Sequence, residues 1–253
     1  MAVMDTFETI RHRRAVRYYI DKKVEEADMQ TILNAGRLAP SVLNSQPLEF
    51  IRVKDPEKLK LIHEMMLHGW EVEMGAFDGF NCYAGTQSYP TTQNLPRQEE
   101  FTPMDYYHPS EIIIVATDEE KRESTPYSSN EYFSDSGNAA SSAIMNMMLA
   151  ARSMGIGSVW LSFPDSVEIK WHFNIPKTMG IAAMLNFGYP DRWPEIPDVI
   201  GADDPRFWPR RPVENMVHYE KFDEDKWQKE TRNLFMYGPV IGKDRYLEIE
   251  AKK

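Results

Sequence analysis

The spacing of hydrophobic residues along the chain predicts several helices. Apolar residues recur at helical intervals over 28–39, and Pro40 ends this helix because proline disfavours helical backbone in the residue before it. Small and sulfur-containing residues repeat every three or four positions over 135–154, where Gly155 follows the longest expected helix. Shorter helices are expected after a capping box at 5–8, over 165–173 and over 223–234.

Short apolar runs predict four strands. Residues 48–53 are expected to keep polar side chains on one face, whereas 111–117 are apolar enough to be buried on both faces. The other two strands are expected at 157–162 and 180–187. Helices mixed with few strands in this order predict an α+β fold around one central sheet. Neither a repeat nor a linker divides the chain, so a single domain over 1–253 is expected.

Two segments show neither the helical nor the strand periodicity of hydrophobic residues. Residues 81–110 combine prolines with aromatic side chains, and a loop of this length in a compact domain is usually a lid or an insertion. We expect a lid, with a surface excursion as the alternative. Residues 190–212 carry repeated prolines and are expected to form an extended arm.

Composition narrows the classes of function. The chain has 253 residues, 42% of them hydrophobic and 27% charged, which is ordinary for a globular protein. A formal net charge of −10 argues against a nucleic-acid partner, because such binding rests on clustered Lys and Arg. No apolar run approaches the ~20 residues of a membrane-spanning helix, and no export signal is recognised at the N-terminus. No membrane association and a cytoplasmic location are therefore expected.

The chain lacks the residue spacing of most motifs that bind nucleotides or metals or supply a nucleophile. Gly155 and Gly157 follow a helix and lack the third glycine of a dinucleotide fingerprint. His63 and His68 would point to different sides of a helix, so no metal site is expected there. Cys82 is the single cysteine and has no activating neighbour in sequence, which disfavours a nucleophilic role.

The remaining candidates suit a flat, anionic, phosphate-bearing molecule. Arg13, Arg14 and Arg17 offer forked, permanently charged donors that match phosphate oxygens, although a solvated helix face is the alternative. Residues 40–47 are expected to form a rigid turn rich in hydroxyl and amide groups, with a plain connecting loop as the alternative. Arg210 and Arg211 add a second basic pair far away in sequence.

These residues resemble the FMN-dependent nitroreductase superfamily. The family's Arg-Arg-Ser-x-Arg stretch is matched at 13–17, and its Ala-Pro-Ser-x-x-Asn-x-Gln-Pro-Trp turn at 39–48. An alanine-rich helix with Gly-x-Gly-Ser matches 139–158, Gly-Tyr-Pro matches 188–190, and Arg-x-Pro with Val-His-Tyr matches 210–219. Two residues depart from the pattern: Ala15 replaces a serine and Leu48 replaces a tryptophan.

The resemblance implies a fold and a cofactor. The fold would be a three-layer α+β sandwich with a central mixed, mostly antiparallel sheet, in an intertwined homodimer that binds FMN at the subunit interface. Arg13 and Arg210 would contact the phosphate, and Arg17 the pyrimidine edge of the ring. Pro40, Ser41 and Val42 would line the ring, while Asn44 and Gln46 fix their turn. The remaining cofactor-binding residues implied by the match are Arg14, Ala15, Trp160, Leu161, Ser162 and Arg211.

The resemblance also implies an activity. FMN would take hydride from NAD(P)H and pass electrons to a small aromatic acceptor, nitroaromatic or quinone, by a ping-pong mechanism. The cofactor would carry the chemistry, so no catalytic side chain and no metal are expected. Alternatives are a specialised branch, such as a reductive dehalogenase, a ring dehydrogenase or a flavin-destroying enzyme, and a flavin-binding protein without turnover. In the expected lid, Tyr83, Tyr89, Tyr106 and Tyr107 are candidate substrate contacts.

Overall fold

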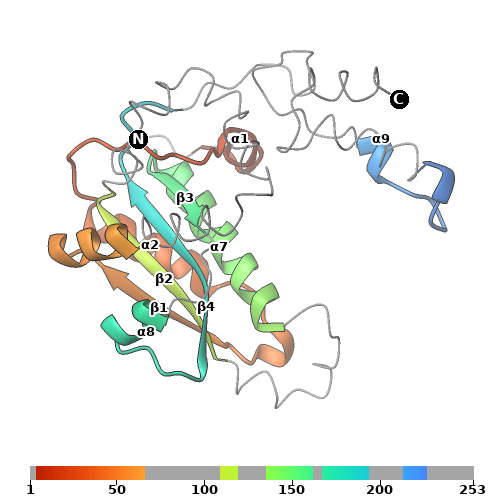
Figure 1. Ribbon diagram of the computed structural model, residues 1–253. Helices are drawn as coiled ribbons and strands as arrows, with labels where there is room; N and C mark the ends of the chain where they lie inside the picture. The colour runs from red at the N-terminus through yellow and green to blue at the C-terminus, as the bar shows by residue number, and fades with distance from the viewer. Residues whose placement is uncertain (1–3, 66–108, 119–134, 162–166, 194–212, 227–253) are drawn as a thin grey trace, which may run out of the picture. The chain divides into compact units, whose positions relative to one another are not determined.

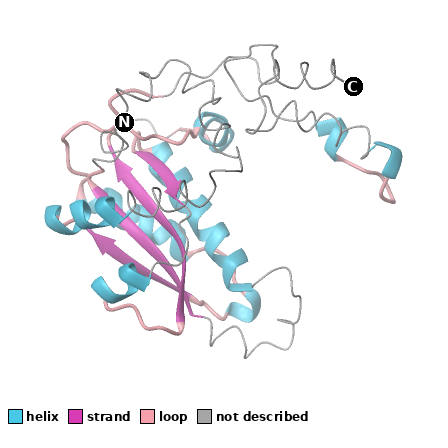
Figure 2. Cartoon of the chain, viewed as in Figure 1, coloured by secondary structure: helices cyan, strands magenta, loops and turns pink. Residues whose placement is uncertain are grey.

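The computed structural model describes residues 4–65, 109–118, 135–161, 167–193 and 213–226 (Figures 1 and 2). The first four ranges belong to one compact unit and 213–226 belong to a second, so each unit is treated by itself. Most of the expected lid and of the proline-rich arm lies outside the described residues.

The expected helices are present with small shifts at their ends. They are α1 (Thr6–His12), α2 (Glu26–Arg37), α7 (Asp135–Ser153) and α8 (Val167–His172). Residues 56–65 and α9 (Val213–Met216) are also helical and were not predicted, and 224–226 begin the helix expected at 223–234. The largest shift is in α2, which begins and ends two residues before its expected bounds.

The start of α1 shows how a local signal was only partly correct. The Asp5 carboxylate accepts hydrogen bonds from the backbone N–H groups of Phe7 and Glu8, as an N-cap should. The Glu8 side chain was expected to complete a capping box, but its carboxylate lies 3.1 Å from Nδ1 of His12. One turn of helix brings these two groups together, so the i, i+4 pair replaces the second half of the box.

Four antiparallel strands form the described sheet. They are β1 (Leu48–Val53), β2 (Glu111–Asp118), β3 (Gly157–Leu161) and β4 (Met179–Gly188), in the order β1-β2-β4-β3. A mixed sheet was expected. Among the described residues the one parallel pairing is an isolated bridge between Ala15 and Ser158. Since β1 and β3 are the two edges of the described sheet, the residues that follow or precede them lie far apart.

Hydrophobic side chains pack on both faces of the sheet. Alternate residues of β2 divide between two clusters: Ile113 and Val115 pack with α2 and α7, whereas Ile112 and Ile114 pack with Ile62 and with α8. The expectation that 111–117 are buried on both faces is therefore confirmed.

The expectation of one polar face on β1 is wrong. Leu48 and Phe50 pack against the first cluster, and Ile51 packs against the second. Glu49 and Arg52 are three positions apart, so the alternation of side chains places them on opposite faces. Both faces of this edge strand consequently contribute to a core.

The chain after α1 is fixed to β3 and to the end of β4. The Val16 N–H donates to the Ser158 carbonyl at 2.9 Å, and the Ile20 N–H donates to the Tyr189 carbonyl at 3.0 Å. Two glycines make this approach possible. A Cβ on Gly157 would lie 2.8–3.0 Å from the Val16 side chain, and one on Gly188 would lie 2.7 Å from the Tyr19 ring. The glycines of the matched family motifs thus have a packing role.

We expect Gly157→Ala to destabilise the protein by about 1–3 kcal/mol, because Val16 is buried and cannot yield to the added methyl group. Thermal unfolding measures the effect. The double variant Val16→Ala with Gly157→Ala is the matched control, since it removes the clashing methyls. Its loss of stability should be smaller than the sum of the two single losses; simple additivity would contradict the packing explanation.

Candidate functional site

The arginines of the arginine segment, residues 13–17, differ in their contacts. The Arg14 guanidinium donates to the carbonyl oxygens of Arg11 and Arg13 at 2.8 and 2.7 Å, so it stabilises the segment's own backbone. Arg17 is half-buried and makes no hydrogen bond or ion pair with any described residue. A permanently charged fork in that position is available to a bound anion or to the polar edge of a ring.

The 40–47 turn is held in an unusual backbone conformation. Leu43, Asn44 and Gln46 have φ of 50°, 57° and 46°, in the left-handed region that favours glycine. The Ser41 hydroxyl accepts a hydrogen bond from the Gln46 N–H at 3.0 Å, and the Ser41 carbonyl accepts one from the Asn44 N–H. Such a conformation costs roughly 1–2 kcal/mol per non-glycine residue and is typical of ligand-binding segments.

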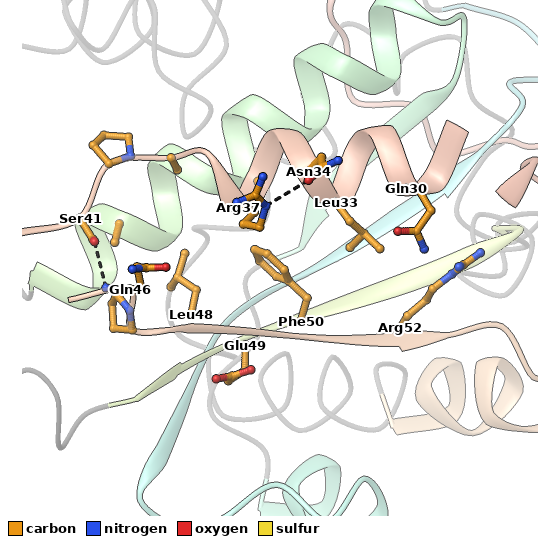
Figure 3. A pocket seen from close by; sticks show the side chains of 15 residues that line it. Gln30, Leu33, Asn34, Arg37, Ser41, Gln46, Leu48, Glu49, Phe50 and Arg52 are labelled. Atoms are coloured by element: carbon orange, nitrogen blue, oxygen red, sulfur yellow. Dashed lines mark hydrogen bonds between the residues drawn. The ribbon is translucent and has the colours of Figure 1, made fainter. Parts of the chain in front are cut away.

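A groove of about 420 Å³ runs beside this turn, between α2 and β1 (Figure 3). Figure 3 shows Ser41 and Gln46 at one end of the groove and Gln30 with Arg52 at the other. Leu33, Leu48 and Phe50 supply its apolar wall. Three residues implied by the family resemblance, Pro40, Ser41 and Gln46, therefore line one cavity.

Arg52 links the sheet to the beginning of α2. Its guanidinium donates through Nε and Nη2 to the two carboxylate oxygens of Glu111, and through Nη1 to Glu26 at 2.6 Å. The Glu111 side chain is 4% exposed and that of Arg52 is 18% exposed. The sequence signal for this network was a charged residue within otherwise apolar strands, and sequence reasoning missed it.

The Arg52 and Gln30 hydrogen bonds lower the pKa of Glu26 from 4.5 to about 2. A carboxyl group with a lowered pKa in the folded state contributes stability above its unfolded pKa and loses it as pH falls through the folded value. We therefore expect the stability of the wild type to exceed that of Glu26→Gln above pH 4.5, and the difference to vanish toward pH 2. Urea unfolding of both proteins across this pH range measures it, and parallel curves would contradict the assignment.

The arginine segment and the 40–47 turn lie at opposite corners of the sheet. The segment pairs with Ser158 on edge strand β3, which is aligned with Phe187 and Glu111. The turn leads into Leu48 on edge strand β1, which is aligned with Thr117. The two corners are separated by three strand spacings across the sheet, about 14 Å, and by the six residue steps from Glu111 to Thr117 along β2, about 20 Å. Figure 1 shows the two segments at opposite ends of the sheet.

The comparisons with known proteins agree with this fold. The model of the nitroreductase family matches residues 10–189, which is more than half of the chain. The chain belongs to the nitroreductase family. One relative is a protein of Archaeoglobus fulgidus that bears the name NADH dehydrogenase/NAD(P)H nitroreductase. It is 32% identical to this chain, over 83% of this chain and 94% of its own length.

Two solved structures share the nitroreductase fold. A nitroreductase family protein of Clostridium difficile 630 has a TM-score of 0.60 at 21% identity, covering 87% of this chain and 100% of that one. The NADPH:FMN oxidoreductase of Vibrio harveyi, solved in complex with NAD+, has a TM-score of 0.56 at 18% identity, covering 98% of this chain and 91% of that one. The expected nitroreductase-like arrangement of helices around an antiparallel sheet is confirmed.

Two motifs of the family match have structural roles here. Tyr189, in Gly-Tyr-Pro, has the Lys22 ammonium 3.9 Å from its ring centre, and its pKa is raised, chiefly by burial. In the second unit, Nδ1 of His218 accepts a hydrogen bond from the Asp223 N–H at 2.9 Å, and the His218 ring stacks on Phe222. These motif residues therefore stabilise local structure in this member of the nitroreductase family.

The site residues on β3 point into the protein. Leu161 is buried, and the Trp160 Nε1–H is enclosed with no partner among the described residues. Asn186 on β4, which sequence reasoning did not single out, is fully buried, and neither of its amide atoms has a hydrogen-bond partner in the described part of the chain. An enclosed atom cannot reach a bound molecule without rearrangement, so β3 can offer a ligand its backbone groups but not these side-chain atoms.

Several candidate residues of the site lie outside the described residues: Ser162, Arg210, Arg211, Tyr83, Tyr89, Tyr106 and Tyr107. Cys82, for which no role was expected, lies outside them too. Within the described ranges, no three His, Cys, Asp or Glu residues are grouped so that they could hold a metal ion. In the same ranges no helix is both long and apolar enough to cross a membrane.

Proposed function

We propose that this nitroreductase-family protein is an FMN-dependent oxidoreductase that uses NAD(P)H to reduce a small aromatic acceptor, nitroaromatic or quinone, by a ping-pong mechanism. The observation that carries the proposal is the half-buried Arg17, which has no partner among the described residues and lies on a segment fixed to β3. The names of the Archaeoglobus and Vibrio proteins support the same class of activity.

The donor set fits FMN. When bound, FMN supplies the acceptance and release of hydride. The Arg13 guanidinium, with Arg210, would hold the phosphate, and Arg17 would donate to the pyrimidine edge of the ring. Pro40, Ser41 and Val42 would lie against the ring, while the hydrogen bonds of Ser41 keep their turn rigid. The end of β3 would present a backbone N–H near N5, and the other cofactor-binding residues proposed are Arg14, Ala15, Asn44, Gln46, Trp160, Leu161, Ser162 and Arg211.

The geometry supports a site shared between two chains. Arg17 and the 40–47 turn are both proposed to touch the same ring, yet they lie at opposite corners of one sheet. No side chain spans that separation. In a homodimer, the arginine segment of one chain and the turn of its partner can meet at one FMN. We therefore propose an intertwined homodimer of single-domain, three-layer sandwiches, located in the cytoplasm, with the proline-rich arm wrapping the partner.

The test is direct. Purified protein, or protein mixed with FMN, should be yellow, and its flavin absorption should bleach when NADH or NADPH is added without oxygen. Addition of 1,4-naphthoquinone should restore the absorption, and sedimentation should report a dimer. A colourless protein that does not bind added FMN would overturn the proposal, and a monomer that binds FMN fully would overturn the shared site.

A further inference from the structure

Two arginines line the groove between α2 and β1, and their surroundings differ. Arg52 is held by the carboxylates of Glu111 and Glu26. Arg37 forms no ion pair with any described residue. Its Nε–H donates to Oδ1 of Asn34 at 3.0 Å, which orients the guanidinium and leaves both Nη groups for another acceptor. A cation in the last turn of α2 suits the helix dipole, but the dipole does not fix the direction of the side chain.

Glu49 is the acidic residue that lines the groove within the described ranges, and it does not face this cation. Side chains alternate along β1, so Glu49 lies on the opposite face from Leu48 and Phe50. Figure 3 shows Glu49 on the far side of β1 from Arg37. The groove therefore presents a positive charge that its own lining does not neutralise.

The walls beside Arg37 are apolar. Leu33 on α2 and Leu48 and Phe50 on β1 are half-buried, and Figure 3 shows their side chains in the space between the helix and the strand. The volume of about 420 Å³ lies within the range of small-molecule sites, roughly 300–1,000 Å³. A flat body of two fused rings fits a space of this size.

We infer that this groove binds a small carboxylic acid with a flat apolar body. The Nη groups of Arg37 donate to the carboxylate, because a planar guanidinium fork matches two carboxylate oxygens. Leu33 and Phe50 cover the body and remove its surface from water. The inference goes beyond the proposed function and does not require FMN, because no group of the flavin takes part in it.

The probe is 2-naphthoate, compared with its neutral isostere 2-naphthamide and with acetate, which lacks the apolar body. Calorimetric titration of the full chain, with and without FMN, measures the three affinities. The wild type should bind 2-naphthoate about tenfold more tightly than 2-naphthamide, and acetate more weakly than both. Arg37→Gln should weaken 2-naphthoate by about tenfold, the scale of one charged hydrogen bond, and leave 2-naphthamide within about twofold.

Lys60→Gln is the matched control, because it removes one positive charge from a side chain that is 67% exposed and lies outside the groove. Its affinity for 2-naphthoate should equal that of the wild type. Equal losses in the two variants, or equal affinity of the wild type for the acid and the amide, would overturn the inference. Displacement of 2-naphthoate by FMN would place it in the cofactor site and overturn the inference as well. The expected pattern in a protein that binds no FMN would support this site and overturn the proposed function alone.

Discussion

Replacing Arg52 with alanine should destabilise the fold by about 3–5 kcal/mol, because it leaves the Glu111 carboxylate buried without its charged partner. The same change removes the hydrogen bond to Glu26 and so frees the start of α2 from the sheet. Since α2 leads directly into the 40–47 turn, its displacement should also weaken any binding there. Urea unfolding of the wild type and of Arg52→Ala measures the loss.

A paired control distinguishes an unpaired charge from simple loss of packing. The double variant Arg52→Met with Glu111→Leu replaces the ion pair by apolar side chains of similar length. Its stability should return to within about 1 kcal/mol of the wild type, because no charge is then buried alone. A double variant as unstable as Arg52→Ala would mean that side-chain packing, and not the unpaired carboxylate, accounts for the loss.

Arg17→Ala should make bound FMN harder to reduce, whereas Arg14→Ala should have a smaller effect. Of these two arginines, Arg17 lacks a hydrogen-bond partner among the described residues, whereas Arg14 donates to two backbone carbonyls. Loss of a charged hydrogen bond costs about 1.5–3 kcal/mol. If the bond is made to the negatively charged reduced ring, the two-electron potential should fall by about 30–65 mV.

The potential of bound FMN in each variant, measured against a reference dye, tests this assignment. FMN content is determined in the same samples, so that a changed potential is not confused with loss of cofactor. Arg14→Ala should instead lower thermal stability, because it removes two hydrogen bonds that hold the arginine segment. An Arg17→Ala protein with the potential of the wild type would mean that Arg17 does not touch the pyrimidine edge.

Periodicity was sufficient to locate most of the secondary structure. The strand at 48–53 was predicted at its observed bounds, and α7 ends within one residue of its prediction. Helix 56–65 was missed because its apolar positions are few and its charged residues many, although Ile62 is fully buried. Residues 223–234 were predicted as a helix, and the described part begins one, with Asp223 accepting a hydrogen bond from the Lys226 N–H.

Local patterns were informative because side chains one turn or two residues apart share a face whatever the rest of the chain does. The order of the motifs likewise indicated the nitroreductase family, which the family match confirms. The pairing of Arg52 with Glu111, 59 positions away, and the separation of Arg17 from the 40–47 turn were decided only in three dimensions. Both depend on which strands are neighbours and in what register, and that arrangement results from packing among distant segments, which no local spacing encodes.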